Sequence, residues 1–560
     1  MTLKDLMKLQ NGSDIRGVAL EGVEGEAVNL TEEACLKIGG AFALWLSKKT
    51  GKPVDQLTVG IGRDSRLSGP FLELAVAKGL TANGVNVVRC GMATTPAMFM
   101  SIVFPQTKYD GSVMITASHL PFNRNGLKFF DKDGGLEHED ITAVLELSDA
   151  QDAEKNKAAD ISKNGIYDLI ETYAAHIRKS IVKGLSSSES DKPLSGLKIV
   201  VDSGNGASGF FVDKILNPLG ADTTGSQFLE PDGSFPNHIP NPENKAAMQA
   251  IKTATVNNKA DLGLIFDTDV DRMSAVLSNG EEVNRDAIIA MVAAILAPSN
   301  PGSTIITDSV TSDRLTYFLE DVLKLKHLRY MRGYKNVINE SIRLNNEGIV
   351  SPLAIETSGH GALSENYFLD DGAYLSVKMV IELAKRHALG EKMEALDVFH
   401  PERMADRILG MGDMLTLIEK AQESYDEEQA AKLEKKFRKN EFTLEDFLEQ
   451  MGQMQKMGGI GKMLEMMPGM GAGKLSDDDI DRSERELKQM EAIIFSMTPA
   501  ERQNPQILNA SRRKRISAGC GQPVSKINNL IKRYEDAKKM MKQLSSPSFM
   551  KKNKRFKGLF

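Results

Sequence analysis

Short apolar runs, separated by polar loops and helical stretches, fill the first two thirds of the chain. The runs are rich in β-branched residues and too short for ordinary helices, so they are predicted to be strands. Strand, polar loop and helix in repeated succession indicate an α/β fold. An amphipathic helix, Ala373–His387, ends this part. The predicted strands are Leu57–Ile61, Val85–Arg89, Ser112–Ile115, Leu197–Val201, Leu262–Phe266 and Ser303–Thr307.

The pattern changes near residue 390, where the chain becomes helical and rich in methionine. Seven methionines, interleaved with glycine, lie between residues 451 and 470, in a segment with few branched apolar side chains. Not all seven can be core residues, and flexible thioethers suit a surface that binds varied apolar partners. We expect Met490 and Met497, by contrast, to be ordinary core residues. The seven are Met451, Met454, Met457, Met463, Met466, Met467 and Met470.

Length and charge add a division into several domains with different partners. A chain of 560 residues is expected to form three or four domains. The net charge of −6 is unevenly spread. Four cations stand together at Arg512–Arg515, and from Lys542 to the end there are six Lys or Arg and no Asp or Glu. This basic part favours nucleic acid or an acidic surface as its partner.

Cysteine usage and hydropathy bear on the cellular location. Cys35, Cys90 and Cys520 are too few and too scattered for a disulfide framework or a zinc site, which fits a reducing compartment. No apolar run has the length of a membrane span, and the stretch after Met1 is not typical of a signal peptide. We expect a cytoplasmic protein, with the plastid stroma as the alternative.

One loop combines residues that suit catalysis. The run Ser112–Ile115 leads into a loop rich in Pro, Asn and Gly that carries the Ser118 hydroxyl and the His119 imidazole, with Lys128 ten residues after the serine. Loops at strand ends are frequent sites of chemistry. A capped turn without function is the alternative, because Ser and Asn favour turns for local reasons.

A second loop suits a metal ion. Directly after Leu262–Phe266 come Asp267, Asp269 and Asp271, which can converge on one hard divalent cation. The three carboxylates would repel one another in the absence of a cation, which argues against a solvated acidic turn. An EF-hand is excluded because its Gly and closing Glu are missing. The sequence therefore predicts a magnesium site.

A third pattern leaves two interpretations open. Gly204, Gly206 and Gly209 follow the strand Leu197–Val201 with the spacing of a dinucleotide-binding loop. That fingerprint alone is weak evidence. The same glycines would also serve a strand-to-helix turn in which two backbone segments pack closely.

These loops resemble those of the α-D-phosphohexomutases, the family of phosphoglucomutase and phosphomannomutase. The serine loop matches T-A-S-H-x-P-x-x-x-N-G-x-K, and the acidic loop matches D-x-D-x-D-R through Arg272. The sugar-recognition motif G-E-x-S-G-H occurs as Ile355–His360, with Ile355 in place of the first Gly. The resemblance covers about residues 8–388. It implies three α/β domains over residues 1–190, 191–299 and 300–389, joined to the all-α domain at 390–545 and a basic tail at 546–560.

The resemblance also implies an activity and roles for individual residues. Mutases of this family move a phosphoryl group between O1 and O6 of a hexose through a phosphoserine, with Mg²⁺ and a hexose 1,6-bisphosphate activator. Glucose or mannose specificity remains open. The implied roles are catalysis by Ser118, His119, Lys128 and Arg16, Mg²⁺ binding by Ser118, Asp267, Asp269 and Asp271, and substrate binding by Arg272, Lys335, Glu356, Ser358 and His360. Without the resemblance, Arg16 and Lys335, the latter in a predicted basic turn at Arg332–Lys335, would be interpreted as solvated surface cations.

The C-terminal part resembles a different family. The fourth mutase domain should bring an R-x-S-x-T-E-P loop, which the sequence does not contain. Instead, residues 390–545 resemble the M domain of the signal recognition particle protein, without that family's GTPase domain. The resemblance implies signal-peptide binding by the methionines between 451 and 470, and possession of an RNA-binding helix-turn-helix. Its RNA-binding residues would be Ser511, Arg512, Arg513, Lys514, Arg515, Gly519 and Gly521.

The helix-turn-helix also has a basis in the residues themselves. Ser511 is predicted to cap the basic helix, and the second helix is predicted to bury one face. That face consists of Val524, Ile527, Leu530, Tyr534 and Ala537. A solvated basic helix is the alternative. The sequence thus favours a mutase joined to a module that binds signal peptides and signal recognition particle RNA, with ribosome association implied. The competing hypothesis is an inactive mutase scaffold whose working part is the C-terminal module.

Overall fold

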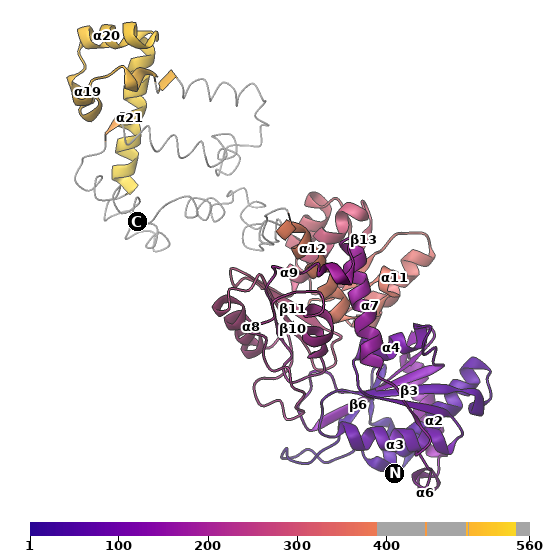
Figure 1. Ribbon diagram of the computed structural model, residues 1–560. Coiled ribbons are helices and arrows are strands. Elements are labelled where there is room, and N and C mark those ends of the chain that lie inside the picture. The colour runs from indigo at the N-terminus through magenta and orange to yellow at the C-terminus, as the bar shows by residue number, and fades with distance from the viewer. Residues whose placement is uncertain (389–442, 445–488, 491, 545–560) are drawn as a thin grey trace. The chain divides into compact units, whose positions relative to one another are not determined.

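The computed structural model describes residues 1–388, 443–444, 489–490 and 492–544. The chain divides into two compact units, Met1–Phe399 (unit 1) and His400–Phe560 (unit 2). Unit 1 contains three β-sheets that follow one another along the sequence (Figure 1). The predicted α/β class is confirmed for this unit, and the predicted helical class for the C-terminal part. In the part of the chain that the structure describes, no helix is long and apolar enough to span a membrane.

The first sheet has eight strands in the order β1-β2-β6-β5-β3-β4-β8, with β7 paired to β6. The central strands β5, β3 and β4 are parallel, whereas β6 runs antiparallel to β5, with Ser112 opposite Phe130 and Ile115 opposite Leu127. The strands are β1 (Gln10–Asn11), β2 (Asp14–Val18), β3 (Thr58–Arg63), β4 (Asn86–Met92), β5 (Gly111–Ile115), β6 (Arg124–Asp131), β7 (Gly134–Gly135) and β8 (Gly165–Ile166).

Helices pack around this sheet, and most of them are capped by a polar side chain at their start. Thr31 caps α2, and Gly51 ends it in a left-handed conformation at φ 71°. Helices α2 and α3 can pack closely because Gly39 has no side chain. A Cβ at this position would come within 2.6 Å of the Val76 carbonyl oxygen. The helices are α1 (Leu3–Met7), α2 (Glu32–Thr50), α3 (Gly69–Ala82), α4 (Thr95–Val103), α5 (His138–Asp149), α6 (Ala153–Lys157) and α7 (Leu169–Gly184).

The second sheet has the order β12-β11-β10-β9 and positions the acidic loop. Strand β9 (Ile199–Asp202) is parallel to β10 (Leu262–Phe266), and β10 turns back into β11 (Met273–Leu277). Phe266 is opposite Met273, so the six residues between them form the tip of a hairpin. The remaining elements are β12 (Glu282–Val283), α8 (Lys245–Asn257), α9 (Asp286–Leu296) and the short helices η3 (Phe211–Leu216) and η4 (Ala297–Ser299).

The third sheet has the order β14-β13-β15-β16-β17 and carries the predicted sugar loop. That loop connects β15 (Leu353–Ile355) to β16 (Gly361–Leu363) as a second hairpin. The other strands and α-helices are β13 (Thr304–Asp308), β14 (Lys326–Tyr330), β17 (Leu369–Asp370), α10 (Asp313–Tyr317), α11 (Tyr334–Asn346) and α12 (Gly372–Ala388). Helix α12 agrees with the amphipathic helix predicted at Ala373–His387.

The described part of unit 2 is helical, as predicted, and includes α19 (Pro499–Gln503), the 3-10 helix η8 (Pro505–Ile507), α20 (Ala510–Cys520) and α21 (Val524–Leu544). Met490 and Met497 lie in its core, which confirms their predicted role. Ile527, Leu530 and Tyr534 of the predicted α21 face are buried there too. The prediction that Ser511 caps the basic helix is wrong. Asn509 is the N-cap, because its side chain accepts a hydrogen bond from the Arg512 backbone N–H, and Ser511 lies inside α20.

Candidate active site and basic helix pair

The serine loop leaves the first sheet at the end of β5 and brings Ser118 to the acidic loop of the second sheet. Oγ of Ser118 donates a 2.8 Å hydrogen bond to Oδ2 of Asp267, and Nη2 of Arg272 donates to the same Oγ at 2.9 Å. Arg272 also pairs with Oδ2 of Asp267 at 3.1 Å. All three side chains are buried. Two loops that the sequence suggested separately therefore meet in one site.

The acidic loop fits a divalent cation. Asp267, Asp269 and Asp271 each offer an oxygen within 4.8 Å of the others, and all three are buried. Oδ1 of Asp269 and Oδ1 of Asp271 have no hydrogen-bond partner among the described residues. Buried acceptors normally have a partner, and a hard cation would provide one for both. An all-oxygen donor set suits Mg²⁺.

Lys128 lies beside these carboxylates. Its Nζ is 2.9 Å from Oδ2 of Asp269 and 2.5 Å from Oδ2 of Asp271. Burial alone would lower the pKa of Lys128, but the two carboxylates outweigh it and hold the pKa well above its usual range. Burial would likewise raise the pKa of Asp269, yet Lys128 holds it below its ordinary value. Burial and the neighbouring carboxylates raise the pKa of Asp267.

His119 and Arg16 complete the first-domain side of the site. Nδ1 of His119 lies 3.3 Å from Oγ of Ser118 and also contacts Arg272. Burial, Arg272 and Arg16 together lower the pKa of His119 to about 3, so the imidazole is neutral at neutral pH. Arg16 donates to Oδ2 of Asp14 at 2.9 Å, and this carboxylate raises the arginine's pKa although burial opposes it.

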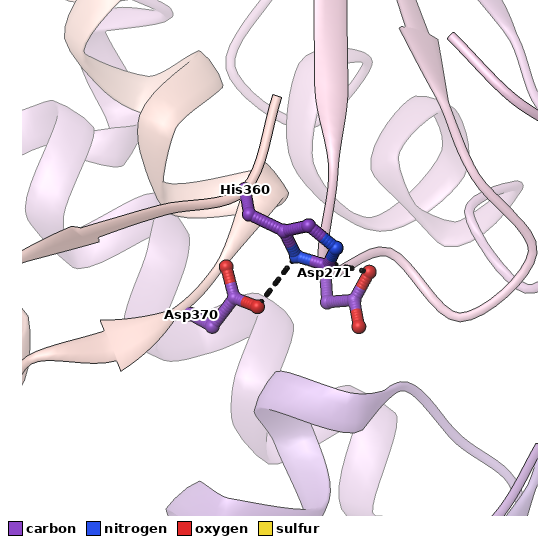
Figure 2. A group of neighbouring side chains, drawn as sticks. All are labelled: Asp271, His360 and Asp370. Atoms are coloured by element: carbon purple, nitrogen blue, oxygen red, sulfur yellow. Dashed lines mark hydrogen bonds and ion pairs between the residues drawn. The ribbon is translucent and has the colours of Figure 1, made fainter. Parts of the chain in front are cut away.

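His360 of the sugar loop lies between two carboxylates (Figure 2). Its Nδ1 is 2.6 Å from Oδ2 of Asp370 and 3.7 Å from Oδ1 of Asp271. Burial would lower the pKa of His360, but Asp370 and Asp271 raise it. The His360 ring also stacks on Tyr334, with 5.2 Å between the ring centroids. The predicted substrate residue His360 is thus brought directly to the acidic loop.

Glu356 and Ser358 lie in the same hairpin loop as His360. Oε1 of Glu356 accepts a 2.7 Å hydrogen bond from the Gly333 backbone N–H. Ser358 Oγ donates to Oε2 of Glu356 at 3.4 Å. Glu356 therefore links the hairpin loop to Gly333, which adopts φ 121° at the start of α11.

The prediction that Lys335 lies in a loop turn is wrong. Lys335 belongs to helix α11, as its second residue. Its Nζ donates to the carbonyl oxygens of Gly135 and Leu136 at 2.7 and 2.6 Å and pairs with Glu137 at 2.8 Å. These contacts tie the third domain to the first. A cavity of about 90 Å³ lies at this junction, and its walls include Lys128 and Lys335.

The glycine pattern after β9 serves packing. A Cβ on Gly206 would come within 2.9 Å of Cα of Thr268 in the acidic loop, and one on Gly209 within 2.6 Å of the Leu229 carbonyl oxygen. The Ala207 backbone N–H donates to the Thr268 carbonyl oxygen at 2.9 Å. The glycines let this turn pack directly against the acidic loop. This packing favours the interpretation as a strand-to-helix turn over that as a dinucleotide-binding loop.

In unit 2, α20 and α21 form a pair joined through Gly521, which is left-handed at φ 66°. Arg512 and Arg515 both pair with Glu501, whose side chain is fully buried. Arg513 donates to the Asn528 side chain at 2.9 Å. The two side chains that pair with Glu501 remain 43% and 51% exposed, so they can still reach a partner.

The other predicted RNA-binding residues lie on the same helix or at its end. Ser511, Lys514 and Gly519 are exposed on α20, and Gly521 is exposed just after it. The structure therefore presents a basic helix surface backed by one buried carboxylate. The seven methionines predicted to line a signal-peptide groove lie outside the described residues.

Comparison with known families agrees with this division. Residues 7–155, 171–280 and 284–399 match the models of phosphoglucomutase/phosphomannomutase alpha/beta/alpha domains I, II and III. Residues 423–558 match the model of the signal peptide binding domain. The chain joins these two families. Its N-terminal part consists of mutase domains I to III, and its C-terminal part contains a signal peptide binding domain.

Individual relatives support each part. Over 183 residues the chain is 54% identical to the signal recognition particle protein of Bacillus subtilis, which covers 32% of this chain and 41% of the relative. The Escherichia coli protein of that name is 44% identical over 191 residues, 34% of this chain and 42% of the relative. The chain thus spans less than half the length of these relatives.

Solved structures resemble the mutase domains. A phosphoglucomutase/phosphomannomutase family protein from Burkholderia thailandensis has a TM-score of 0.56 at 26% identity, covering 71% of this chain and 80% of that one. A putative phosphomannomutase from Thermus thermophilus shares the fold, with a TM-score of 0.56 at 21% identity over 69% of this chain and 82% of that one.

Several site residues were not predicted from the sequence. Thr95 Oγ1 donates to Oδ2 of Asp269 at 2.5 Å. Asp370 pairs with His360, Asp14 pairs with Arg16, and Glu501 pairs with Arg512 and Arg515 of α20. Of these residues, Asp370 could have been found from the sequence, because Asp370 and Asp371 form an adjacent acidic pair directly before a helix. The others are ordinary polar residues whose partners lie far away in the sequence.

The lowered pKa of His119 predicts acid sensitivity of the mutase domains. The unfolded chain binds a proton at His119 near pH 6.5, whereas the folded site binds one only near pH 3. The stabilising contribution of the neutral imidazole is therefore complete above pH 6.5 and is lost as the pH falls towards 3. His119→Gln should reduce the loss of stability between pH 7 and 5, by at most about 1.4 kcal/mol per pH unit. Urea unfolding midpoints of both proteins at the two pH values measure this. An unchanged pH dependence would contradict the buried, neutral state of His119.

Proposed function

We propose that mutase domains I to III catalyse phosphoryl transfer on a hexose phosphate through a phosphoserine at Ser118. The observation that carries this proposal is the contact of the Ser118 hydroxyl with Asp267 and Arg272. A hydroxyl that would carry a phosphoryl group stands beside a guanidinium that can bind phosphoryl oxygens and carboxylates that can hold a metal ion. The site therefore contains the parts that positional and electrostatic catalysis of phosphoryl transfer requires.

The arginine, lysine and aspartate side chains each have a function in this proposal. Arg272 would hold the phosphoryl oxygens on Ser118, and Arg16 would add positive charge near His119. Lys128 would contribute a second cation, since its raised pKa keeps it protonated. Asp267, Asp269 and Asp271, together with Ser118, would hold Mg²⁺, which when bound neutralises charge on the phosphoryl group. A hexose 1,6-bisphosphate would load the serine.

The third domain would hold the sugar. Glu356 and Ser358 offer acceptors and a donor for sugar hydroxyls, and His360 offers a ring nitrogen close to Asp271. Lys335 would bind the phosphate of the sugar. In this structure it is bound to two carbonyl oxygens and Glu137, so it would exchange these partners for phosphate oxygens.

The metal site is tested by Asp269→Asn and by removal of divalent cations with a chelator. Loss of one carboxylate from a buried metal site should lower the rate of phosphoryl transfer about 10²-fold. Removal of one group that stabilises charge in a transition state typically has an effect of this size. The rate of ³²P transfer from hexose 1,6-bisphosphate to the protein measures it, with Mg²⁺ present and absent. Asp313→Asn, at a 97% exposed carboxylate, is the matched control. Transfer that is indifferent to the chelator would rule out a metal ion in the reaction.

The C-terminal domain supports a second function by a separate observation. The exposed basic surface of α20 and the 54% identity to a signal recognition particle protein favour binding of signal peptides and of that particle's RNA. We propose that this domain binds both ligands in the cytoplasm, with the ribosome as a further partner. If unit 1 is only an inactive scaffold, the purified chain will acquire no phosphoserine, whereas RNA binding will persist.

A further inference from the structure

Arg66 is a buried cation that the proposed reaction does not use. It lies in the loop between β3 and α3, and none of its surface is exposed. A buried charge is costly unless hydrogen bonds and an opposite charge compensate it. Oδ2 of Asp64, also fully buried, lies 3.3 Å from Nε of Arg66.

The two terminal nitrogens of Arg66 point into the serine loop. Nη2 donates to the carbonyl oxygens of Ser118 and Leu120 at 2.5 and 2.6 Å. Nη1 donates to those of Pro121 and Arg124 at 2.7 and 2.9 Å. One guanidinium therefore binds four carbonyl groups of a loop that lies more than 50 positions away in the sequence. Only a planar, forked cation can reach four acceptors in this way.

Asp64 holds the other side of Ser118. Its Oδ2 accepts the Thr116 hydroxyl at 2.7 Å, and Thr116 Oγ1 accepts the Ser118 backbone N–H at 2.8 Å. Ser118 has φ 52°, a left-handed conformation that non-glycine residues rarely adopt. The surroundings must hold such a residue in place, and here the ion pair of Asp64 and Arg66 fixes both its N–H and its carbonyl.

The second domain covers this ion pair. The Phe235 ring lies over the guanidinium, with 5.2 Å between the ring centroid and Cζ of Arg66. A Cβ on Gly233 would come within 2.4 Å of the Leu67 backbone nitrogen, so this segment packs directly against the Arg66 loop. The domain that supplies the acidic loop thus also contacts the residue that holds the serine loop.

We infer that Arg66 is a positioning residue that holds the Ser118 nucleophile in its left-handed conformation and aims its hydroxyl at the acidic loop. The inference rests on the proposed function for its catalytic consequence. Arg66 acts through the backbone and does not touch the phosphoryl group. A misplacement of a reacting group by about 1 Å can cost about 10²-fold in rate, so the effect should appear in kcat. The KM for the sugar phosphate should stay the same, because the third domain is unaltered.

Arg66→Lys tests this inference with two readouts. Lysine keeps the charge but lacks the fork, so it can bind only part of the carbonyl set. Phosphoryl transfer to Ser118 should become about 10-fold to 10²-fold slower, and amide hydrogen exchange over residues 118–124 should become faster. Arg89→Lys is the matched control, since Arg89 is a cation of the same domain that pairs with Glu73 at 2.7 Å. It should change neither readout.

The two readouts separate this inference from the proposed function. If the unaltered protein accepts no phosphate, the proposed function fails, and hydrogen exchange alone decides whether Arg66 holds the loop. If the Arg66→Lys protein shows the same amide hydrogen exchange and the same rate of phosphoryl transfer as the unaltered protein, the inference is overturned. Should Arg66→Lys fail to fold, Phe235→Leu, which uncovers the guanidinium without removing it, must show faster exchange over residues 118–124 for the inference to stand.

Discussion

Replacement of Ser118 by alanine is expected to abolish phosphoryl transfer while unit 1 stays folded. The change removes one oxygen, and with it the atom that would carry the phosphoryl group. Asp267 keeps its ion pair with Arg272 at 3.1 Å, so no buried charge loses its only partner. Alanine retains a Cβ at φ 52°, so the backbone conformation costs about the same as in the native protein.

Three measurements check this prediction. Intact mass after incubation with hexose 1,6-bisphosphate should show one added phosphate on the native chain and none on Ser118→Ala. Mutase turnover should fall to background, and the thermal midpoint should change little. Ser47→Ala is the control, since Ser47 only donates to the Lys52 carbonyl oxygen at the end of α2. A phosphorylated or active Ser118→Ala protein would show that another residue is the nucleophile.

The two loops at the centre of the site could be found from the sequence because their chemistry is local. Ser118 and His119 are adjacent, and the carboxylates of Asp267, Asp269 and Asp271 alternate directly after a buried strand. Strand ends are places where side chains converge, so residue type and spacing were enough to suggest a reactive loop and a metal loop.

The residues that hold these loops could not be found in this way. Arg66 is 52 positions from Ser118 and contacts it only through a backbone carbonyl, for which no residue pattern exists. Asp370 lies in β17, whereas His360 lies in the loop directly before β16, and their contact depends on the register of β16 and β17. Such contacts arise from the tertiary fold, and a single sequence carries no record of them.

Helix boundaries explain the two predictions that were wrong. Ser511 and Asn509 are both good capping residues, and the helix starts two residues earlier than the run of cations suggested. Lys335 follows Gly333, which looked like part of a turn. The glycine instead allows the chain to enter α11 at φ 121°, and the lysine becomes part of the first helical turn. Local residue preferences were the same for either boundary.

The largest effect expected in unit 2 concerns the basic helix. If α20 binds structured RNA, replacing Arg512, Arg513, Lys514 and Arg515 by alanine should remove four phosphate contacts. Each contact contributes about 0.7 to 0.9 to the slope of log K against log salt. The slope should therefore decrease by about 3, and affinity near physiological salt should fall roughly 10³-fold, toward that of non-specific binding.

The structure requires one addition to this design. Glu501 is buried, and burial would raise its pKa, but the Thr498 backbone N–H and Arg515 hold it below its ordinary value. Removal of Arg512 and Arg515 would leave this carboxylate without its cations, and an unpaired buried charge destabilises a fold. The fourfold variant should therefore be combined with Glu501→Gln, and its helicity checked by circular dichroism before binding is compared.

Titration of the full chain with a signal recognition particle RNA hairpin at several salt concentrations then decides the role of α20. Lys532→Ala, at an exposed cation on α21, is the matched control and should leave the RNA affinity nearly unchanged. Binding of an apolar signal peptide should persist in every variant, because it depends on buried apolar area and not on phosphate contacts. Equal RNA affinity in the folded fourfold variant would leave Arg512 to Arg515 as a solvated helix surface. Loss of peptide binding together with RNA binding would instead indicate that the change had unfolded the domain.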